Sequence, residues 1–181
     1  MCSQNGEDGV LAEIFRRIGR TDRIFVEIGA GDNGQNNTSY LHAQRWTGFW
    51  IDGDNTNERI LVSMPGRPEI RARTAMVTRE YIAPIFKEMD VPGEFDFLSI
   101  DSDQNTYHIW EALGAYRPRV VVVDYNASIP PGIDWKVIYD PNAFWDGGIN
   151  YGQLDCFREN WQGKELQPCS LQNDRGERVF S

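Results

Sequence analysis

Residues 26–34, VEIGAGDNG, decide the fold, because the apolar run RIFVEI ends here at closely spaced glycines. Glycine lets a backbone approach a ligand without an intervening Cβ, and a helix that follows such a turn presents free N–H groups to the same point. The helical pattern of residues 37–46 follows this turn. The order indicates a cofactor-binding turn. The alternative is a plain strand-to-helix turn in which glycine only relieves steric strain.

One acidic residue beside the glycines narrows the choice of cofactor. Gly29, Gly31 and Gly34 have the spacing of a dinucleotide fingerprint, so the glycines alone leave an NAD-dependent oxidoreductase open. Glu27, two residues before the first glycine, would repel a diphosphate. S-adenosylmethionine carries a sulfonium and an ammonium and no phosphate, so a nearby carboxylate favours it. We therefore expect S-adenosylmethionine as the cofactor and regard the oxidoreductase as the less favoured alternative.

Helical and strand patterns alternate along the chain outside the glycine turn. Gly19 is a plausible C-cap for the first helix, and Asn37 or Thr38 an N-cap for the second. Pro84 interrupts and weakens the third. The expected helices cover residues 7–18, 37–46, 79–90 and 106–116, and the expected strands 23–28, 48–52, 70–78 (near a sheet edge), 95–101 and 120–126. Strands separated by helices predict an α/β fold with a mostly parallel central sheet and right-handed crossovers.

Size and composition limit the class of protein. A chain of 181 residues is by default one domain, here residues 1–181. Its 40% hydrophobic and 25% charged residues are typical of a globular protein. The formal net charge of −9, with no basic run, argues against a nucleic-acid partner. An acidic surface suits a cationic ligand or a metal, although acidity also serves solubility.

Cysteine usage and hydropathy point to a location. The three cysteines, Cys2, Cys156 and Cys169, have no CxxC spacing and cannot form a disulfide framework, which fits a reducing compartment. No apolar stretch reaches the roughly 20 residues that span a bilayer, and the N-terminus lacks the pattern of a signal peptide. We therefore predict a cytoplasmic protein with no membrane partner.

Acidic residues at the end of the second predicted strand are candidate cofactor ligands. Asp52 lies one strand–helix–strand step after the glycine turn, where an acid commonly binds ribose hydroxyls, and Asp54 follows two residues later. An ordinary charged loop after a strand is the alternative for either residue.

Two later strands end in polar side chains that suit a metal. Asp101 follows one of the two most apolar runs, and Asp124 and Asn126 follow the other, on the side where open parallel sheets bind ligands. Their oxygens suit Mg²⁺, which lowers the pKa of a bound hydroxyl. Simple capping of strands and helices is the alternative.

Histidine and aromatic side chains give weaker signals. His108 lies on a predicted helix, where a packing role is favoured over a general base. Five aromatic residues are candidates for a substrate pocket, although core packing is commoner: Trp110, Tyr125, Trp135, Trp145 and Tyr151.

Several blocks together resemble the FkbM-like S-adenosylmethionine-dependent methyltransferases. The blocks run to about residue 148 and read SQNGEDGVLAEIF, VEIGAGDNGQNNTSYL, GFWIDGD, FDFLSIDSDQNTYHIW, RPRVVVVDYNASIPPG and YDPNAFWDGG. The resemblance implies a class I methyltransferase fold, which is a Rossmann-like three-layer sandwich. It also implies that the cofactor lies over four residues: Glu27, Gly29, Gly31 and Asp52.

The family's chemistry is O-methylation of hydroxyls on sugars or natural products, in some members with Mg²⁺. The resemblance implies a hydroxyl-bearing small molecule as the substrate, with the metal held by Asp101, Asp124 and Asn126. The sequence departs from the family where a DxDGND pattern is expected, because Asp103, Gln104 and Asn105 stand there. The family's closing helix and antiparallel hairpin are expected at residues 151–161 and 177–180, and the abrupt start and short tail suggest a trimmed chain.

Two functional readings of the methyltransferase fold follow. In the first, the protein is an O-methyltransferase in which Asp101, or a bound cation, helps to deprotonate the acceptor. In the second, the altered loop after Asp101 marks a non-catalytic cofactor-binding module or pseudoenzyme. The acceptor substrate is not encoded in a recognisable pattern, and a homo-oligomer is left open.

Overall fold

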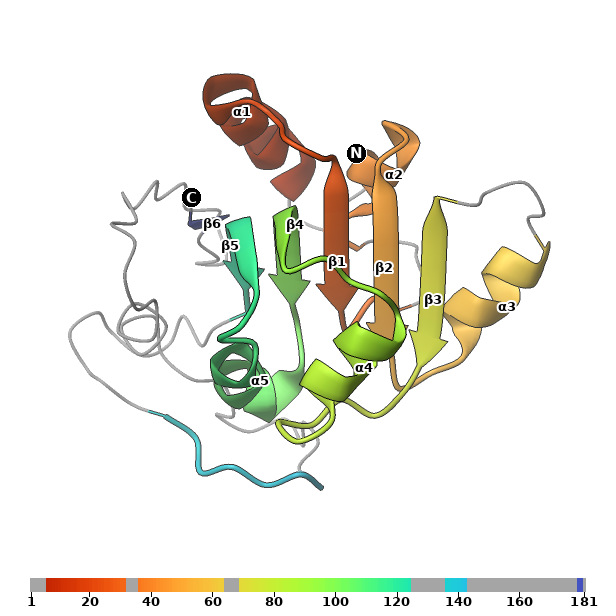
Figure 1. Cartoon of the computed structure of the whole chain (residues 1–181), viewed down its shortest axis with the longest axis vertical. Helices are drawn as coiled ribbons and strands as arrows, with labels where there is room; N and C mark the ends of the chain where they lie inside the picture. The colour runs from red at the N-terminus through yellow and green to blue at the C-terminus, as the bar shows by residue number, and fades with distance from the viewer. Residues whose placement is uncertain (1–5, 32–35, 64–68, 125–135, 143–178, 181) are drawn as a thin grey trace.

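One mixed sheet forms the centre of the molecule (Figure 1). The computed structural model describes residues 6–31, 36–63, 69–124, 136–142 and 179–180. The strands among them are β1 (Ile24–Ile28), β2 (Thr47–Asp52), β3 (Ile70–Thr74), β4 (Glu94–Ile100), β5 (Arg117–Val123) and β6 (Val179–Phe180). They lie in the order β3-β2-β1-β4-β5-β6; β1 to β5 are parallel, and β6 is antiparallel to β5. The mostly parallel sheet, the edge position of the third strand and a short closing strand are thus confirmed.

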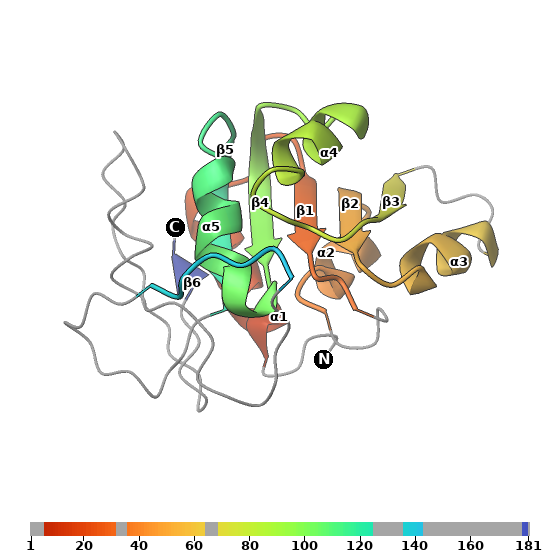
Figure 2. The same cartoon turned by 90° about the horizontal axis from the view of Figure 1, so that it is seen from below.

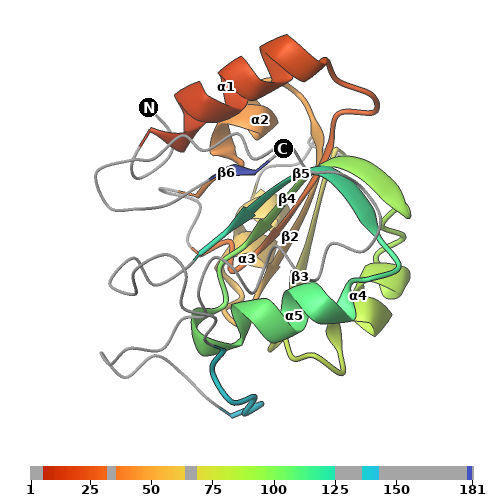
Figure 3. The same ribbon diagram turned by 90° about the vertical axis from the view of Figure 1, so that its left-hand side faces the viewer.

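Helices cover both faces of the sheet, which gives three layers (Figure 3). The helices of the described residues are α1 (Glu7–Ile18), α2 (Ser39–Ala43), α3 (Thr56–Ser63), α4 (Ile82–Glu88) and α5 (Thr106–Ala112), with a 3-10 turn, η1 (Asp103–Asn105), before α5. Side chains of α1, α2 and α3 pack on one face, and those of α4 and α5 pack on the other. The predicted three-layer α/β sandwich is confirmed.

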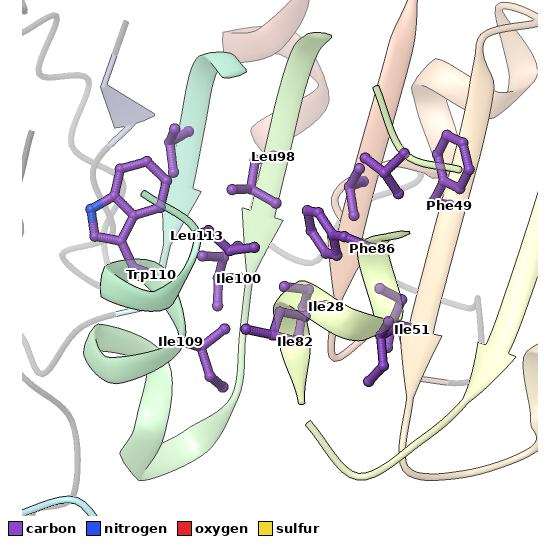
Figure 4. Close-up of a cluster of buried hydrophobic side chains, with 14 of the residues drawn as sticks. Ile28, Phe49, Ile51, Ile82, Phe86, Leu98, Ile100, Ile109, Trp110 and Leu113 are labelled. Carbon is purple, nitrogen blue, oxygen red and sulfur yellow. The ribbon is translucent and has the colours of Figure 1, made fainter. Parts of the chain in front are cut away.

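Alternate side chains of each central strand enter two separate cores. In β1, Val26 and Ile28 face α4 and α5, whereas Phe25 faces α1 and α2. Figure 4 shows the first core, in which α4 and α5 lay apolar side chains on the sheet: Ile82, Phe86, Ile109, Trp110 and Leu113 against Ile28, Ile51, Leu98 and Ile100. Because both faces are covered, the central strands read as nearly continuous apolar runs.

One predicted helix differs from the structure, one observed helix was not predicted, and one prediction cannot be compared. Helix α4 begins at Ile82, not at residue 79, so Pro84 lies in its first turn, where the missing N–H breaks no helical hydrogen bond. The expected interruption there was wrong. Helix α3 was not predicted, because its apolar residues are few and only Leu61 packs against a core. The helix predicted at 151–161 lies outside the described residues.

An ion pair between a half-buried arginine and a buried carboxylate joins the amino ends of β4 and β5. Asp96 of β4 is fully buried and accepts hydrogen bonds from the backbone N–H groups of Thr21, Asp22 and Arg23. Arg119 of β5 lies 2.7 Å from its carboxylate and also donates to carbonyls at the end of α1. Although desolvation raises the pKa of Asp96, the hydrogen bonds from Arg119 and the loop outweigh it, and the net pKa is lowered. This pair stabilises the end of the sheet opposite to the one described next.

Membrane insertion finds no support in the helices. Among the residues that the structure describes, no helix has both the length and the apolar character that crossing a bilayer requires.

Candidate functional site

A cleft of about 220 Å³ opens at the carboxyl ends of the parallel strands. It is lined by residues that directly end or follow β1, β2, β3 and β4, together with Asn105 and Pro141: Ile28, Gly29, Asp52, Gly53, Met76, Val77, Asp101, Ser102, Asn105 and Pro141. Figure 2 views the molecule towards these strand ends. The chain progresses from β1 to β3 in one direction and continues with β4 in the other, so the cleft lies at the switch point between β1 and β4.

Gly29 is required by the contact between the ends of β1 and β4. It has φ +77°, and a Cβ built there would lie 1.8 Å from the carbonyl oxygen of Asp101. Its N–H donates to the carbonyl of Ile51 in β2. Gly31 has φ +57° with open space around it, so its backbone conformation alone favours glycine. The steric explanation therefore holds for Gly29, and Gly29 also lines the cleft.

Asp52 is held in a fixed position at the rim of the cleft. One carboxylate oxygen accepts from the N–H of Gly31 and the other from the N–H of Asp54, each at 2.8 Å. Asn57, buried at the start of α3, donates to the carbonyl of Gly31 at 2.9 Å and fixes the same turn from below. The loops after β1 and β2 are therefore joined through the carboxylate that lines the cleft.

Asp54 has a different position from Asp52 and does not line the cleft. Its carboxylate accepts from the backbone N–H and the hydroxyl of Thr56, the first residue of α3. These hydrogen bonds lower the pKa of Asp54. The contacts are those of an Asx turn just before α3, as the ordinary-loop alternative for this residue implied.

Glu27 points into the protein, not into the cleft. Strand alternation places it on the face of α2, where it is buried and accepts from the N–H of Asn37, at 2.9 Å, and from the hydroxyl of Thr38. That hydroxyl in turn accepts from the indole N–H of Trp50. Thr38 occupies the N-cap position of α2, but its side chain bonds Glu27 and does not cap the helix. The expectation that Glu27 faces the ligand and repels a diphosphate was therefore wrong.

Burial also changes the charge of Glu27. Desolvation raises the pKa of this carboxyl from 4.5 to about 7, against the opposing effect of its hydrogen bonds with Thr38 and Asn37. The negative charge of Asp101 contributes a smaller rise. Near neutral pH the group is thus partly protonated, and its hydrogen bonds join the start of α2 to β1.

Of the proposed metal ligands, only Asp101 reaches the cleft among the described residues. Asp101 is exposed there, directly after β4. Asp124 is half-buried, and its backbone N–H donates a hydrogen bond to the carbonyl of Ile100, which extends the pairing of β5 with β4. Asn126 lies outside the described residues. The described part of the chain has no group of three His, Cys, Asp or Glu side chains placed to hold a metal. The metal assignment stays a prediction.

His108 packs, as expected, and does so against a segment that the sequence did not single out. Its Nε2 lies 2.8 Å from the carbonyl of Val137, and its ring contacts that of Tyr139. Trp110 belongs to the core, so its proposed role in a substrate pocket is wrong. The other aromatic candidates lie outside the described residues: Tyr125, Trp135, Trp145 and Tyr151.

Seven residues of the cleft were not candidates from the sequence: Ile28, Gly53, Met76, Val77, Ser102, Asn105 and Pro141. Met76 is 53% exposed and places an apolar side chain on the wall of the cleft. The position of Met76 and Val77 after a predicted strand could have identified them, because parallel strands end at one edge. Pro141 belongs to the block YDPNAFWDGG of the family resemblance, but no period or spacing indicated that it lines a cleft.

Solved structures with the same arrangement are methyltransferases by description. A proposed O-methyltransferase from Klebsiella pneumoniae superposes with a TM-score of 0.54 at 16% identity, over 96% of this chain and 77% of that chain. A proposed O-methyltransferase from Nostoc punctiforme PCC 73102 gives 0.52 at 12% identity, over 96% and 54%. This chain has the class I methyltransferase fold.

More distant matches and sequence searches add no family. A methyltransferase of Burkholderia thailandensis, solved with S-adenosylhomocysteine, superposes with a TM-score of only 0.44 at 15% identity, over 66% of this chain. This chain spans 52% of that chain, and 44% of a further match from Galdieria sulphuraria, so it covers about half the length of such neighbours. No protein-family model matches the sequence, and no curated protein is similar to it.

Proposed function

We propose that the protein is an S-adenosylmethionine-dependent methyltransferase of the FkbM-like kind that methylates a hydroxyl of a small molecule. The observation that carries the proposal is the charge of the cleft. Two carboxylates, Asp52 and Asp101, line it, and its described lining contains no Lys, Arg or His. A diphosphate would meet only negative charge there, whereas a sulfonium and an ammonium would be attracted. The electrostatic argument therefore passes from Glu27 to these two residues.

Each residue of the cleft has a part in this proposal. Asp52, fixed by the N–H groups of Gly31 and Asp54, would accept the ribose hydroxyls, and Gly29, which packs against the carbonyl of Asp101, lines the cleft beside it. The bound cofactor would supply a methyl group on a positively charged sulfur that is already a good leaving group. Its sulfur would keep the electrons of the carbon–sulfur bond when the methyl group passes to the acceptor oxygen. Asp101 takes the hydroxyl proton, and catalysis is otherwise positioning.

Titration of the protein with S-adenosylmethionine and S-adenosylhomocysteine tests the cofactor. Asp52→Asn is expected to weaken binding on the order of 10-fold, because one carboxylate at the rim then loses its charge and a hydrogen bond. Asp54→Asn is the matched control at the end of the same strand, outside the cleft, and is expected to change affinity less than twofold. Binding of neither compound to the unmodified protein would end the proposal.

A Mg²⁺ ion held by Asp101, Asp124 and Asn126 is a separate part of the proposal. Metal-assisted transfer predicts that EDTA abolishes methylation and that added Mg²⁺ restores it. Unchanged turnover in EDTA would leave Asp101 as the base without a metal.

A non-catalytic cofactor-binding module is the second candidate, and the turn η1 after Asp101 favours it. Residues Asp103–Asn105 form a 3-10 turn where the resembled family has a glycine. Tight binding of S-adenosylmethionine without methyl transfer to any of a broad panel of hydroxyl compounds would decide for this candidate. A hydroxyl-bearing substrate, a cytoplasmic location and the absence of a nucleic-acid partner stay predictions.

A further inference from the structure

Polar side chains in the first turn of α3 tie this helix to the ends of two strands. The helix lies beside β3 at the edge of the sheet (Figure 1). Asn57 donates from Nδ2 to the carbonyl of Gly31, in the turn after β1, at 2.9 Å. Glu58 accepts at 2.7 Å from the backbone N–H of Thr74, the last residue of β3. Leu61, one turn further on, packs against the core, so these two hydrogen bonds fix the start of the helix.

Gly31 is the residue at which Asn57 and the carboxylate of the cleft meet. Its carbonyl accepts from Asn57, and its N–H donates to Oδ2 of Asp52 at 2.8 Å. The two bonds therefore hold the peptide group after Gly31 and the peptide group before it. Gly31 has φ +57° and open space where a Cβ would lie, and glycine moves freely between backbone conformations. The direction of its N–H consequently depends on the bond from Asn57 to its carbonyl.

The N–H of Gly31 sets the direction of the Asp52 carboxylate. One oxygen of Asp52 accepts from Gly31 and the other from the N–H of Asp54, so the carboxylate is held at both oxygens. A carboxylate oxygen can accept more than one hydrogen bond, and each oxygen therefore keeps a site for a ligand. Asn57 is 3% exposed and does not line the cleft, whereas Asp52 does. Asn57 thus acts on the cleft through Gly31 and not by contact with a ligand.

We propose that Asn57 is a positioning residue for the cofactor: its amide holds Gly31, and Gly31 directs the carboxylate of Asp52 towards the ribose hydroxyls. The inference rests on the proposed function. A carboxylate that is already oriented loses less side-chain entropy when a ligand binds, so the bond from Asn57 strengthens binding without any contact to the ligand. Asn57 carries no charge, and its effect on affinity therefore passes through the geometry of Asp52 alone.

A double-mutant cycle with S-adenosylhomocysteine, measured by calorimetry, tests the proposal. Asn57→Ala alone is expected to weaken binding about fivefold, which is the effect of one hydrogen bond. Asp52→Asn no longer offers two carboxylate oxygens to orient, so adding Asn57→Ala to it is expected to weaken binding by less than about twofold more. Glu58→Ala is the matched control, because it removes the other hydrogen bond of the same helical turn. It is expected to lower stability in urea and to leave the affinity within about twofold.

The outcomes separate the two proposals. If the unmodified protein does not bind S-adenosylhomocysteine, the proposed function fails. If it binds, and Asn57→Ala either leaves the affinity unchanged or weakens it by the same factor with and without Asp52→Asn, the cofactor stands and the role of Asn57 is overturned. An equal loss of affinity in Glu58→Ala overturns it too, because any loosening of α3 would then suffice. Should Asn57→Ala fail to fold, Asn57→Asp keeps the shape of the side chain and loses the donor, and an unchanged affinity in this variant overturns the proposal equally.

Discussion

Replacing Glu27 by glutamine is expected to remove a large pH dependence from the stability of this protein. The side chain is 3% exposed, and burial raises its pKa from 4.5 to about 7. Between these values the folded state keeps a proton that the unfolded state releases, so rising pH favours unfolding. The shift corresponds to about 3 kcal/mol, which the unmodified protein gains below pH 4.5 and loses as the pH rises to about 7.

Glutamine fits the same contacts without a titration. Its carbonyl oxygen can accept from the N–H of Asn37, and its amide can donate to the hydroxyl of Thr38, which also accepts from Trp50. Urea unfolding at pH 5 and pH 8 measures the effect. Relative to the unmodified protein, Glu27→Gln is expected to gain about 2 to 3 kcal/mol in the free energy of unfolding between these two pH values.

A control separates burial from loss of charge. Glu88→Gln removes one negative charge from a glutamate that is 62% exposed, and it is expected to change stability by less than about 0.5 kcal/mol at either pH. If Glu27→Gln and the unmodified protein lost stability in parallel from pH 5 to pH 8, the buried carboxyl would not titrate as described. The loop between β1 and α2 would then need another explanation.

Three further substitutions test how the sheet is held together. Gly29→Ala is expected to destabilise the protein by more than about 3 kcal/mol, because its Cβ would collide with the carbonyl of Asp101. Gly31→Ala has open space around it and is expected to cost only about 1 kcal/mol of backbone strain. Thermal unfolding measures both variants, and an equal fall in their melting temperatures would contradict this prediction. Asp96→Ala leaves Arg119 without its buried partner and is expected to cost about 3–5 kcal/mol in urea unfolding at pH 7. Because the pKa of Asp96 is lowered, this stabilisation is present above its unfolded pKa of 3.8 and is lost as the pH falls towards the folded value. The free energies of unfolding of Asp96→Ala and of the unmodified protein should therefore converge in acid. A difference that stayed constant with pH would count against the ion pair.

Local patterns predicted most of the fold. The helix at residues 7–18 and its C-cap at Gly19 match α1, because both signals are short-range, and the alternation of residues 70–74 identified an edge strand. Helix α3 escaped because its few apolar residues give a weak period. Strand ends placed Gly29, Asp52 and Asp101 at one edge of the sheet, since parallel strands share a direction.

Neither the direction of the Glu27 side chain nor the position of residues 136–142 could be predicted in the same way. The sequence showed that Glu27 precedes the glycine turn, but a central strand has two buried faces. Only tertiary packing shows that its carboxylate lies on the face that α2 covers. Residues 136–142 are held beside the cleft by hydrogen bonds between residues about 30 positions apart, such as Asn105 with Asp140. No period or local propensity records such contacts.

A crystal structure of the protein grown with S-adenosylhomocysteine tests the central claim most directly. The account predicts ligand density over Gly29, with the ribose hydroxyls on Asp52 and no ordered group of the ligand on Glu27. Density elsewhere on the molecule, or an empty cleft at saturating ligand, would contradict the account.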